Sequence, residues 1–319
     1  MNQLGITDLE VGTIGLGTAW LKKSQSDASE VVAAHLSTGN NLIDTASDYG
    51  DGDAEEIIGK VISDIPREEI VLVTKVGHQS RGVKGDEFTP EIVLKNIDKS
   101  LQRMKTDYVD VALIHTGGGE SGTDILMDGE VMEALSEVRD SGKVRYIGYS
   151  GDNSAALYAI RIPVDVVEMS LSIVDQANIQ SIEEARENGV GILAKRSISD
   201  GSWKGKKRQH KSVWDYASVY RHRLIKMLRI LTSQGYDMID IGLDESDPAW
   251  VRLFLSFALS HDIGVALVGT TNPDHAMENA GYTEEIMDTD LLDLFYDSWK
   301  KAESADPLAE YGASWKGLG

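Results

Sequence analysis

Short runs of apolar and β-branched residues recur along this chain, separated by longer stretches in which apolar positions follow helical spacing. There are eight such runs, at residues 13–17, 41–46, 70–76, 109–115, 144–150, 164–170, 190–196 and 263–270. They are apolar on both faces, which is typical of parallel strands buried between two layers. The stretches between them, such as residues 26–39 with a glycine at the end, fit amphipathic helices. Repeated strand–helix units predict a parallel sheet, and eight strands can close a barrel.

We therefore expect a single (β/α)8 TIM barrel domain over residues 1–319, preceded by an N-terminal hairpin. Two stretches depart from the repeat: residues 197–224, after the seventh strand, and the tail after about Asp288. We expect each of these two stretches to form additional helices or loops outside the barrel. A doubly wound open sheet is the alternative fold.

Composition narrows the range of partners. The chain has 31 Lys and Arg against 52 Asp and Glu, a net charge of -21, which argues against binding to nucleic acid or anionic membranes. It has no cysteine, which excludes thiolate nucleophiles, disulfides and cysteine-based metal centres, and we expect no bound metal. Neither a secretory signal pattern nor a long apolar run is present, so a cytoplasmic location is expected.

Ionisable residues stand at the ends of three consecutive predicted strands. Asp44, Lys75 and His115 end the second, third and fourth strands, and Tyr49 lies five residues beyond Asp44. The carboxyl ends of barrel strands surround a shared site, so these side chains should meet there. Each alone could be structural, but together they place ionisable groups where an apolar strand would continue, which favours function.

These four side chains suit the donation of a proton to a carbonyl oxygen. A phenol, with a pKa of about 10, is a weak acid at neutral pH. The Lys75 ammonium should lower the pKa of Tyr49, while Asp44 keeps Lys75 charged and oriented. His115 could hydrogen-bond the substrate oxygen. Because no cysteine or serine nucleophile is evident, hydride from a nicotinamide cofactor is the best match for attack on the carbonyl carbon.

At these residues the sequence resembles the aldo-keto reductase family. Matching stretches lie at 44–60, 72–77, 109–115 and 141–150, in family order and spacing, and the resemblance extends from residue 4 to residue 279. It implies that Asp44, Tyr49, Lys75 and His115 form the catalytic tetrad, with Tyr49 as proton donor. It also implies that Trp20 lines the substrate pocket with Tyr49 and His115.

The same resemblance implies a set of cofactor contacts. They are Thr18, Ala19, Asp44, Ser150, Glu168, Lys195, Arg196, Ser197, Gly269, Thr270, Thr271, His275, Glu278 and Asn279. Five positions depart from the family pattern. Gly151 and Glu168 replace an Asn and a Gln, and Gly269 and His275 replace the Lys and Arg that often bind a 2′-phosphate. Lys195 replaces a stacking aromatic residue. NADP(H) is favoured as cofactor, and NAD(H) is possible.

Two other functions remain open at this point. A Schiff-base lyase or aldolase could use Lys75 as its amine, and a non-catalytic redox sensor could bind nicotinamide on the same fold. The expected partner is a small carbonyl compound or sugar, and the expected state is a monomer.

An acidic cluster near Tyr49 has two interpretations. It contains Asp48, Asp51, Asp53, Glu55 and Glu56. Carboxylates so close together could hold a metal ion, but the spacing of Asp53 and Glu56 also fits a helix N-cap with its reciprocal partner, which we favour.

Overall fold

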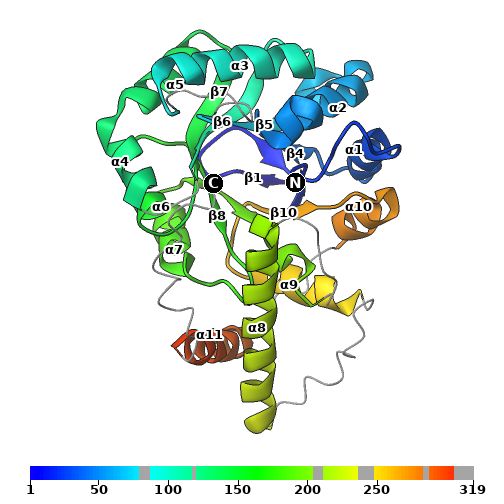
Figure 1. Ribbon diagram of the computed structural model, residues 1–319, viewed down its shortest axis with the longest axis vertical. Coiled ribbons are helices and arrows are strands. Elements are labelled where there is room, and N and C mark those ends of the chain that lie inside the picture. The colour runs from blue at the N-terminus through cyan, green and yellow to red at the C-terminus, as the bar shows by residue number, and fades with distance from the viewer. Residues whose placement is uncertain (79–86, 117–119, 204–210, 236–247, 283–286, 305–319) are drawn as a thin grey trace.

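A computed structural model describes residues 1–78, 87–116, 120–203, 211–235, 248–282 and 287–304, and its centre is a closed barrel of eight parallel strands (Figure 1). The order around the barrel is β10-β3-β4-β5-β6-β7-β8-β9. The strands are β3 (Ile14–Gly17), β4 (Leu42–Asp44), β5 (Val71–Val76), β6 (Val109–His115), β7 (Val144–Ser150), β8 (Val166–Ser170), β9 (Gly191–Lys195) and β10 (Val265–Gly269). The predicted TIM barrel is confirmed, and the open sheet is not formed.

Helices surround the barrel on its outside (Figure 1). They are α1 (Ala28–Ser37), α2 (Asp53–Val61), α3 (Pro90–Met104), α4 (Glu120–Asp128), α5 (Glu130–Asp140), α6 (Asn153–Ala159), α7 (Ile179–Glu187), α9 (Ala249–Leu259) and α10 (Pro273–Ala280). Local sequence signals set some of their starts: Thr89 caps α3 through the Ile92 amide, and Pro90 takes the first helical position.

The barrel interior is closed at its N-terminal end by the predicted hairpin. Its strands, β1 (Asn2–Gln3) and β2 (Glu10–Val11), pair antiparallel. Leu4, Leu9 and Val11 are buried and pack with the inward-facing aliphatic side chains of the barrel strands. These aliphatic side chains fill the lower part of the barrel, so a site inside the barrel can lie only at its C-terminal end.

The two predicted additions are also present. After β9 the chain forms α8 (Lys211–Ser233), and the C-terminal part forms α11 (Thr289–Ser304). These two helices pack against each other beside the barrel (Figure 1). Part of the segment predicted at 197–224, residues 204–210, lies outside the described residues. In the described part of the chain, no helix combines the length and apolar character needed to cross a bilayer.

Candidate active site

Strand alternation brings the polar side chains of the barrel into one layer. Leu42, Val73 and Leu113 belong to the apolar cluster inside the barrel. Two residues further along the same strands stand Asp44, Lys75 and His115, which therefore face the same interior at its C-terminal end. Ser150, Glu168 and Lys195 occupy equivalent places on β7, β8 and β9. The site is thus the polar top layer of a barrel whose lower layers are aliphatic.

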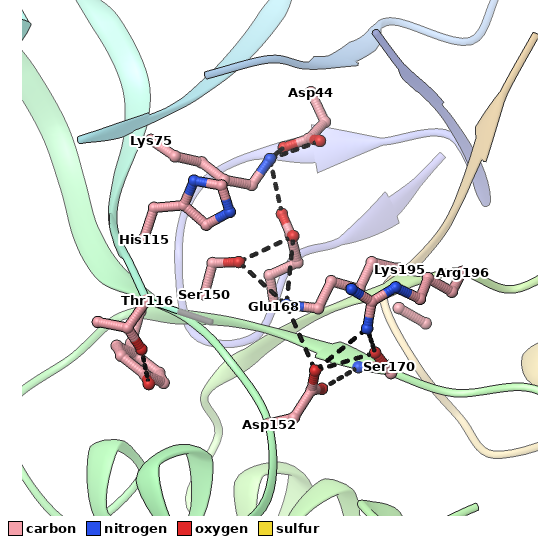
Figure 2. Close-up of polar contacts among 12 residues, drawn as sticks. Asp44, Lys75, His115, Thr116, Ser150, Asp152, Glu168, Ser170, Lys195 and Arg196 are labelled. Atoms are coloured by element: carbon pink, nitrogen blue, oxygen red, sulfur yellow. Dashed lines mark hydrogen bonds and ion pairs between the residues drawn. The ribbon is translucent and has the colours of Figure 1, made fainter. Parts of the chain in front are cut away.

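Lys75 is at the centre of this layer and is fully buried. Its Nζ lies 2.6 and 2.7 Å from the two carboxylate oxygens of Asp44 and 3.1 Å from Oε2 of Glu168 (Figure 2). It also donates to the carbonyl oxygen of Thr45 at 3.2 Å and approaches the Tyr49 hydroxyl at 3.4 Å. The pairing of Lys75 with Asp44 follows the expectation from sequence, whereas the second carboxylate was not foreseen as a partner of Lys75.

Two buried carboxylates therefore share one ammonium. Burial opposes the charged form of Lys75, but Asp44 and Glu168 outweigh it and hold the pKa of Lys75 well above its usual range. Burial alone would raise the pKa of Glu168, but the charges of Lys75 and Lys195 lower it to about 2. Burial and the charge of Glu168 raise the pKa of Asp44 against the pull of Lys75. Because both carboxyl groups lie against the same ammonium, the ionisation of each depends on the charge of the other.

The phenol of Tyr49 does not have the lowered pKa expected from the sequence. Burial raises its pKa well above the ordinary value; Lys75 lowers it, but Asp44, Glu168 and Asp48 raise it further. The expectation considered Lys75 and a single carboxylate and left out burial and the charge of Glu168. Lys75 therefore acts in the predicted direction but is outweighed, and Tyr49 is protonated throughout the neutral range.

His115 lies next to Tyr49, with ring centroids 6.1 Å apart and the two planes nearly perpendicular. Burial lowers the pKa of His115, although Asp48, whose Oδ1 is 3.7 Å from Nδ1, raises it in part. The imidazole is therefore neutral at pH 7 and keeps one N–H donor. Asp48 was assigned to the acidic cluster by sequence, and its place beside His115 was missed.

A second polar network continues from Glu168 along the layer (Figure 2). The Ser150 hydroxyl donates to Oε1 of Glu168 at 2.9 Å, and the Lys195 ammonium donates to the Ser150 hydroxyl at 3.3 Å. Asp152 lies 3.8 Å from Lys195 and 3.4 Å from Arg196. Asp152 was missed by the sequence analysis; its position two residues beyond Ser150, just past a strand end, was the available signal.

The remaining predicted residues divide into two groups: those near the ends of β3 and β9, and those around the start of α10. Thr18 is buried, and its hydroxyl donates to the Asp44 carbonyl at 2.9 Å, so it supports the turn that carries Asp44. The Ser197 hydroxyl is likewise bonded to a backbone carbonyl, that of Ala194. Ala19 is exposed and Trp20 is half-buried at the end of β3, where the Trp20 indole lies against Gly269.

The residues expected to bind the adenine end of the cofactor surround the start of α10. Oδ1 of Asn272 accepts from the amides of Asp274 and His275, at 2.8 and 3.4 Å. Thr271, His275 and Glu278 are exposed, whereas Thr270 is half-buried and Asn279 is buried. A negative side chain, Asp274, lies in the first turn of this helix. The helix start is thus capped by the protein itself.

The acidic cluster near Tyr49 is dispersed among separate partners. Asp53 and Glu56 pair with Lys23, and Glu55 is buried against Arg103. The favoured capping interpretation is wrong: α2 starts at Asp53, its cap residue is Gly52, and no side chain caps it. Throughout the described residues, no three His, Asp or Glu side chains are grouped so that they could hold a metal ion.

The protein is thus a closed eight-stranded barrel with a Tyr, a Lys, a His and paired carboxylates at the C-terminal ends of its strands. The model of the aldo/keto reductase family matches residues 8–295. The chain belongs to this family.

Two curated relatives and one solved structure illustrate the similarity. The chain is 29% identical over 215 residues to L-galactose dehydrogenase of Arabidopsis thaliana, covering 63% of this chain and 66% of that protein. It is 28% identical over 221 residues to the NADH-specific methylglyoxal reductase of Escherichia coli, covering 62% and 67%. The matches therefore span about two thirds of each relative. A solved structure of an aldo-keto reductase described as putative, from Pseudomonas aeruginosa, is 26% identical with a TM-score of 0.66, covering 88% of this chain and 92% of that one.

Proposed function

We propose that this protein interconverts a small aldehyde, ketone or sugar and its alcohol, using NADPH or NADH. The observation that carries the proposal is the position of the Tyr49 hydroxyl, 3.4 Å from the buried Lys75 ammonium and beside the neutral imidazole of His115. A reduced nicotinamide supplies hydride when bound. The protein must then deliver a proton to the developing alkoxide, and Tyr49 is the group placed to do so.

Each neighbouring residue has a role in that transfer. Lys75 stabilises the phenolate that remains after Tyr49 has given up its proton, and Asp44 keeps Lys75 in place. His115, as a neutral donor, is placed to hold the substrate oxygen. The phenol is protonated at neutral pH, as donation of its proton to the substrate oxygen requires.

The residues around Ser150 suit a nicotinamide carboxamide. Glu168 presents a carboxylate that can accept from an amide N–H, and the Ser150 hydroxyl, whose proton is donated to Glu168, has one lone pair left to accept with. For the 2′-phosphate of NADPH the support is weaker. Asn272 already caps α10, Asp274 adds negative charge, and Gly269 offers no side chain. We therefore propose weak discrimination, with NADH accepted about as well as NADPH.

The Lys75 environment argues against a Schiff-base enzyme. An amine nucleophile must lose its proton, but the carboxylates of Asp44 and Glu168 hold the pKa of Lys75 well above its usual value. The ammonium is also fully buried beneath Tyr49. Borohydride treatment with substrate should leave Lys75 unmodified, and a covalent adduct on Lys75 would support the lyase instead.

The test is a pair of measurements on wild type and Tyr49→Phe. Binding of NADPH and NADH is followed by fluorescence, and turnover by nicotinamide absorbance with a panel that includes methylglyoxal, simple ketones and L-galactose. Tyr49→Phe should lose about 10²- to 10⁴-fold in kcat while the cofactor Kd stays within about twofold. Cofactor binding with no turnover by wild type across the panel would favour a redox sensor, and equal loss of binding and turnover in the variant would contradict the role of Tyr49.

A further inference from the structure

We propose that Arg103, held by Glu55, is a positioning residue for Tyr49. The Arg103 guanidinium hydrogen-bonds to the backbone on both sides of Tyr49, within the turn that carries the phenol. It thereby fixes the distance from the Tyr49 hydroxyl to the Lys75 ammonium. This inference rests on the proposed function, because it gives Arg103 a role in the same proton transfer.

The contacts of Arg103 are made to the backbone around Tyr49. Arg103 lies on α3, and its NH1 donates to the Ser47 carbonyl oxygen at 2.9 Å. Its NH2 donates to the Asp51 carbonyl oxygen at 3.4 Å. Ser47 precedes Tyr49 by two residues and Asp51 follows it by two, so a single planar group binds the turn before and after the phenol.

The turn that Arg103 holds is conformationally costly. Gly50, Asp51 and Gly52 have φ values of 60°, 60° and 93°, which are all in the left-handed region. For Asp51, a residue with a Cβ, this conformation is less favourable than for glycine. Gly52 is required for a second reason, because a methyl group there would overlap the Arg103 guanidinium. Such a turn persists only where surrounding contacts hold it.

Glu55 connects Arg103 to β5, the strand that carries Lys75. Oε2 of Glu55 lies 3.0 Å from NH1 of Arg103, and Oε1 accepts from the Thr74 hydroxyl at 2.9 Å. Glu55 is fully buried, and Thr74 is adjacent to Lys75 on β5. The path from the Tyr49 turn through Arg103, Glu55 and Thr74 to Lys75 therefore runs through charge-assisted and buried hydrogen bonds, which fix geometry well.

The same molecule offers a matched control at the other end of the barrel. Arg67 pairs with the buried carboxylate of Asp110 at 2.7 Å and donates to the carbonyl oxygens of Ile70 and Tyr108. The Arg67 side chain is 17% exposed and that of Arg103 is 18% exposed. Asp110 stands near the start of β6, away from the site, and so substitution of Arg67 should cost comparable stability without reaching Tyr49.

The experiment compares Arg103→Met with Arg67→Met. We expect kcat of Arg103→Met to fall about 100-fold, because a displacement of about 1 Å at a reacting group can cost that much. The cofactor Kd should stay within about twofold, and Arg67→Met should keep kcat within about twofold of wild type. Equal losses of kcat in both variants, or full kcat in Arg103→Met, would overturn the proposal. If Arg103→Met does not fold, Arg103→Lys replaces it: its donors lie on one atom, so kcat should still fall about tenfold, and full activity would overturn the proposal.

Hydrogen exchange separates this inference from the proposed function. Amides of residues 47–52 should exchange at least about tenfold faster in Arg103→Met than in Arg67→Met, whether or not a substrate is found. If wild type turns over nothing in the panel, the proposed function fails, and exchange alone decides the positioning role. Equal exchange at residues 47–52 in the two variants overturns it.

Discussion

The buried histidine of α1 gives a prediction on acid stability that can be worked out in numbers. His35 is 2% exposed, and its Nε2 lies 3.1 Å from the carbonyl oxygen of Leu42, to which it donates as a neutral ring. Burial lowers the pKa of His35 from 6.5 to about 4, although the Leu42 carbonyl raises it slightly. Below pH 6.5 the unfolded chain therefore takes up a proton that the folded protein refuses.

The sign and size follow from proton linkage. A depressed folded pKa contributes stability that is present above pH 6.5 and is lost as the pH falls toward 4. The fall in pKa from 6.5 to about 4 corresponds to roughly 3 kcal/mol in full. About 2 kcal/mol of this is lost between pH 7 and pH 5. His35→Gln keeps an N–H donor for Leu42 but cannot titrate, so this loss should vanish in the variant.

The assay is urea unfolding of wild type and His35→Gln at pH 7, 6, 5 and 4, with the exposed His275→Gln as control. The stability of wild type relative to His35→Gln should decrease by about 2 kcal/mol from pH 7 to pH 5. His275→Gln should follow wild type. Parallel curves for wild type and His35→Gln would refute the argument, since they would mean that the folded protein accepts the proton on His35 without cost.

Two further predictions concern the charges around Tyr49. Lys75→Met leaves Asp44 and Glu168 buried without their cation and should cost about 3 to 5 kcal/mol at pH 8. That cost should shrink toward pH 5 in urea unfolding, because without Lys75 burial raises the pKa of both carboxyls and they take up protons as the pH falls. A constant cost would contradict this prediction. Glu168→Gln removes one carboxylate that raises the pKa of Tyr49. Alcohol oxidation at pH 9 needs the phenolate, so kcat should rise about tenfold for each unit by which that pKa falls, and an unchanged oxidative rate would count against the electrostatic role of Glu168.

Much of the fold was predictable because barrel strands carry local signals. The strands at 109–115 and 144–150 were placed at their observed bounds, since each is a buried run that ends in a polar residue. Strand alternation then brings Asp44, Lys75 and His115 into one layer, as expected from their positions at strand ends. These features depend on residues near in sequence or on strands that are neighbours.

What the sequence did not reveal depends on contacts across the barrel and on burial. Glu168 is two strands beyond His115, and only the closed geometry brings it to 3.1 Å from Lys75. The direction of the Tyr49 pKa shift follows from burial and from the nearby carboxylates, which no spacing encodes. By sequence, Glu55 is part of an acidic cluster with a metal-binding and a capping interpretation, whereas in the structure it is buried and paired with Arg103 of α3. The catalytic and cofactor roles of the predicted residues stay predictions until the variants are measured.

The N-terminal hairpin closes one end of the barrel and leaves the C-terminal end as the open one. Leu4 fits over Gly191 and Gly264, where a methyl group on either glycine would crowd it. A molecule that reaches the polar layer must therefore enter and leave by the rim, past the loops that follow the strands. Changes in those loops alone can then alter substrate selectivity. The hairpin and the barrel strands, which position the polar residues of the site, need not change.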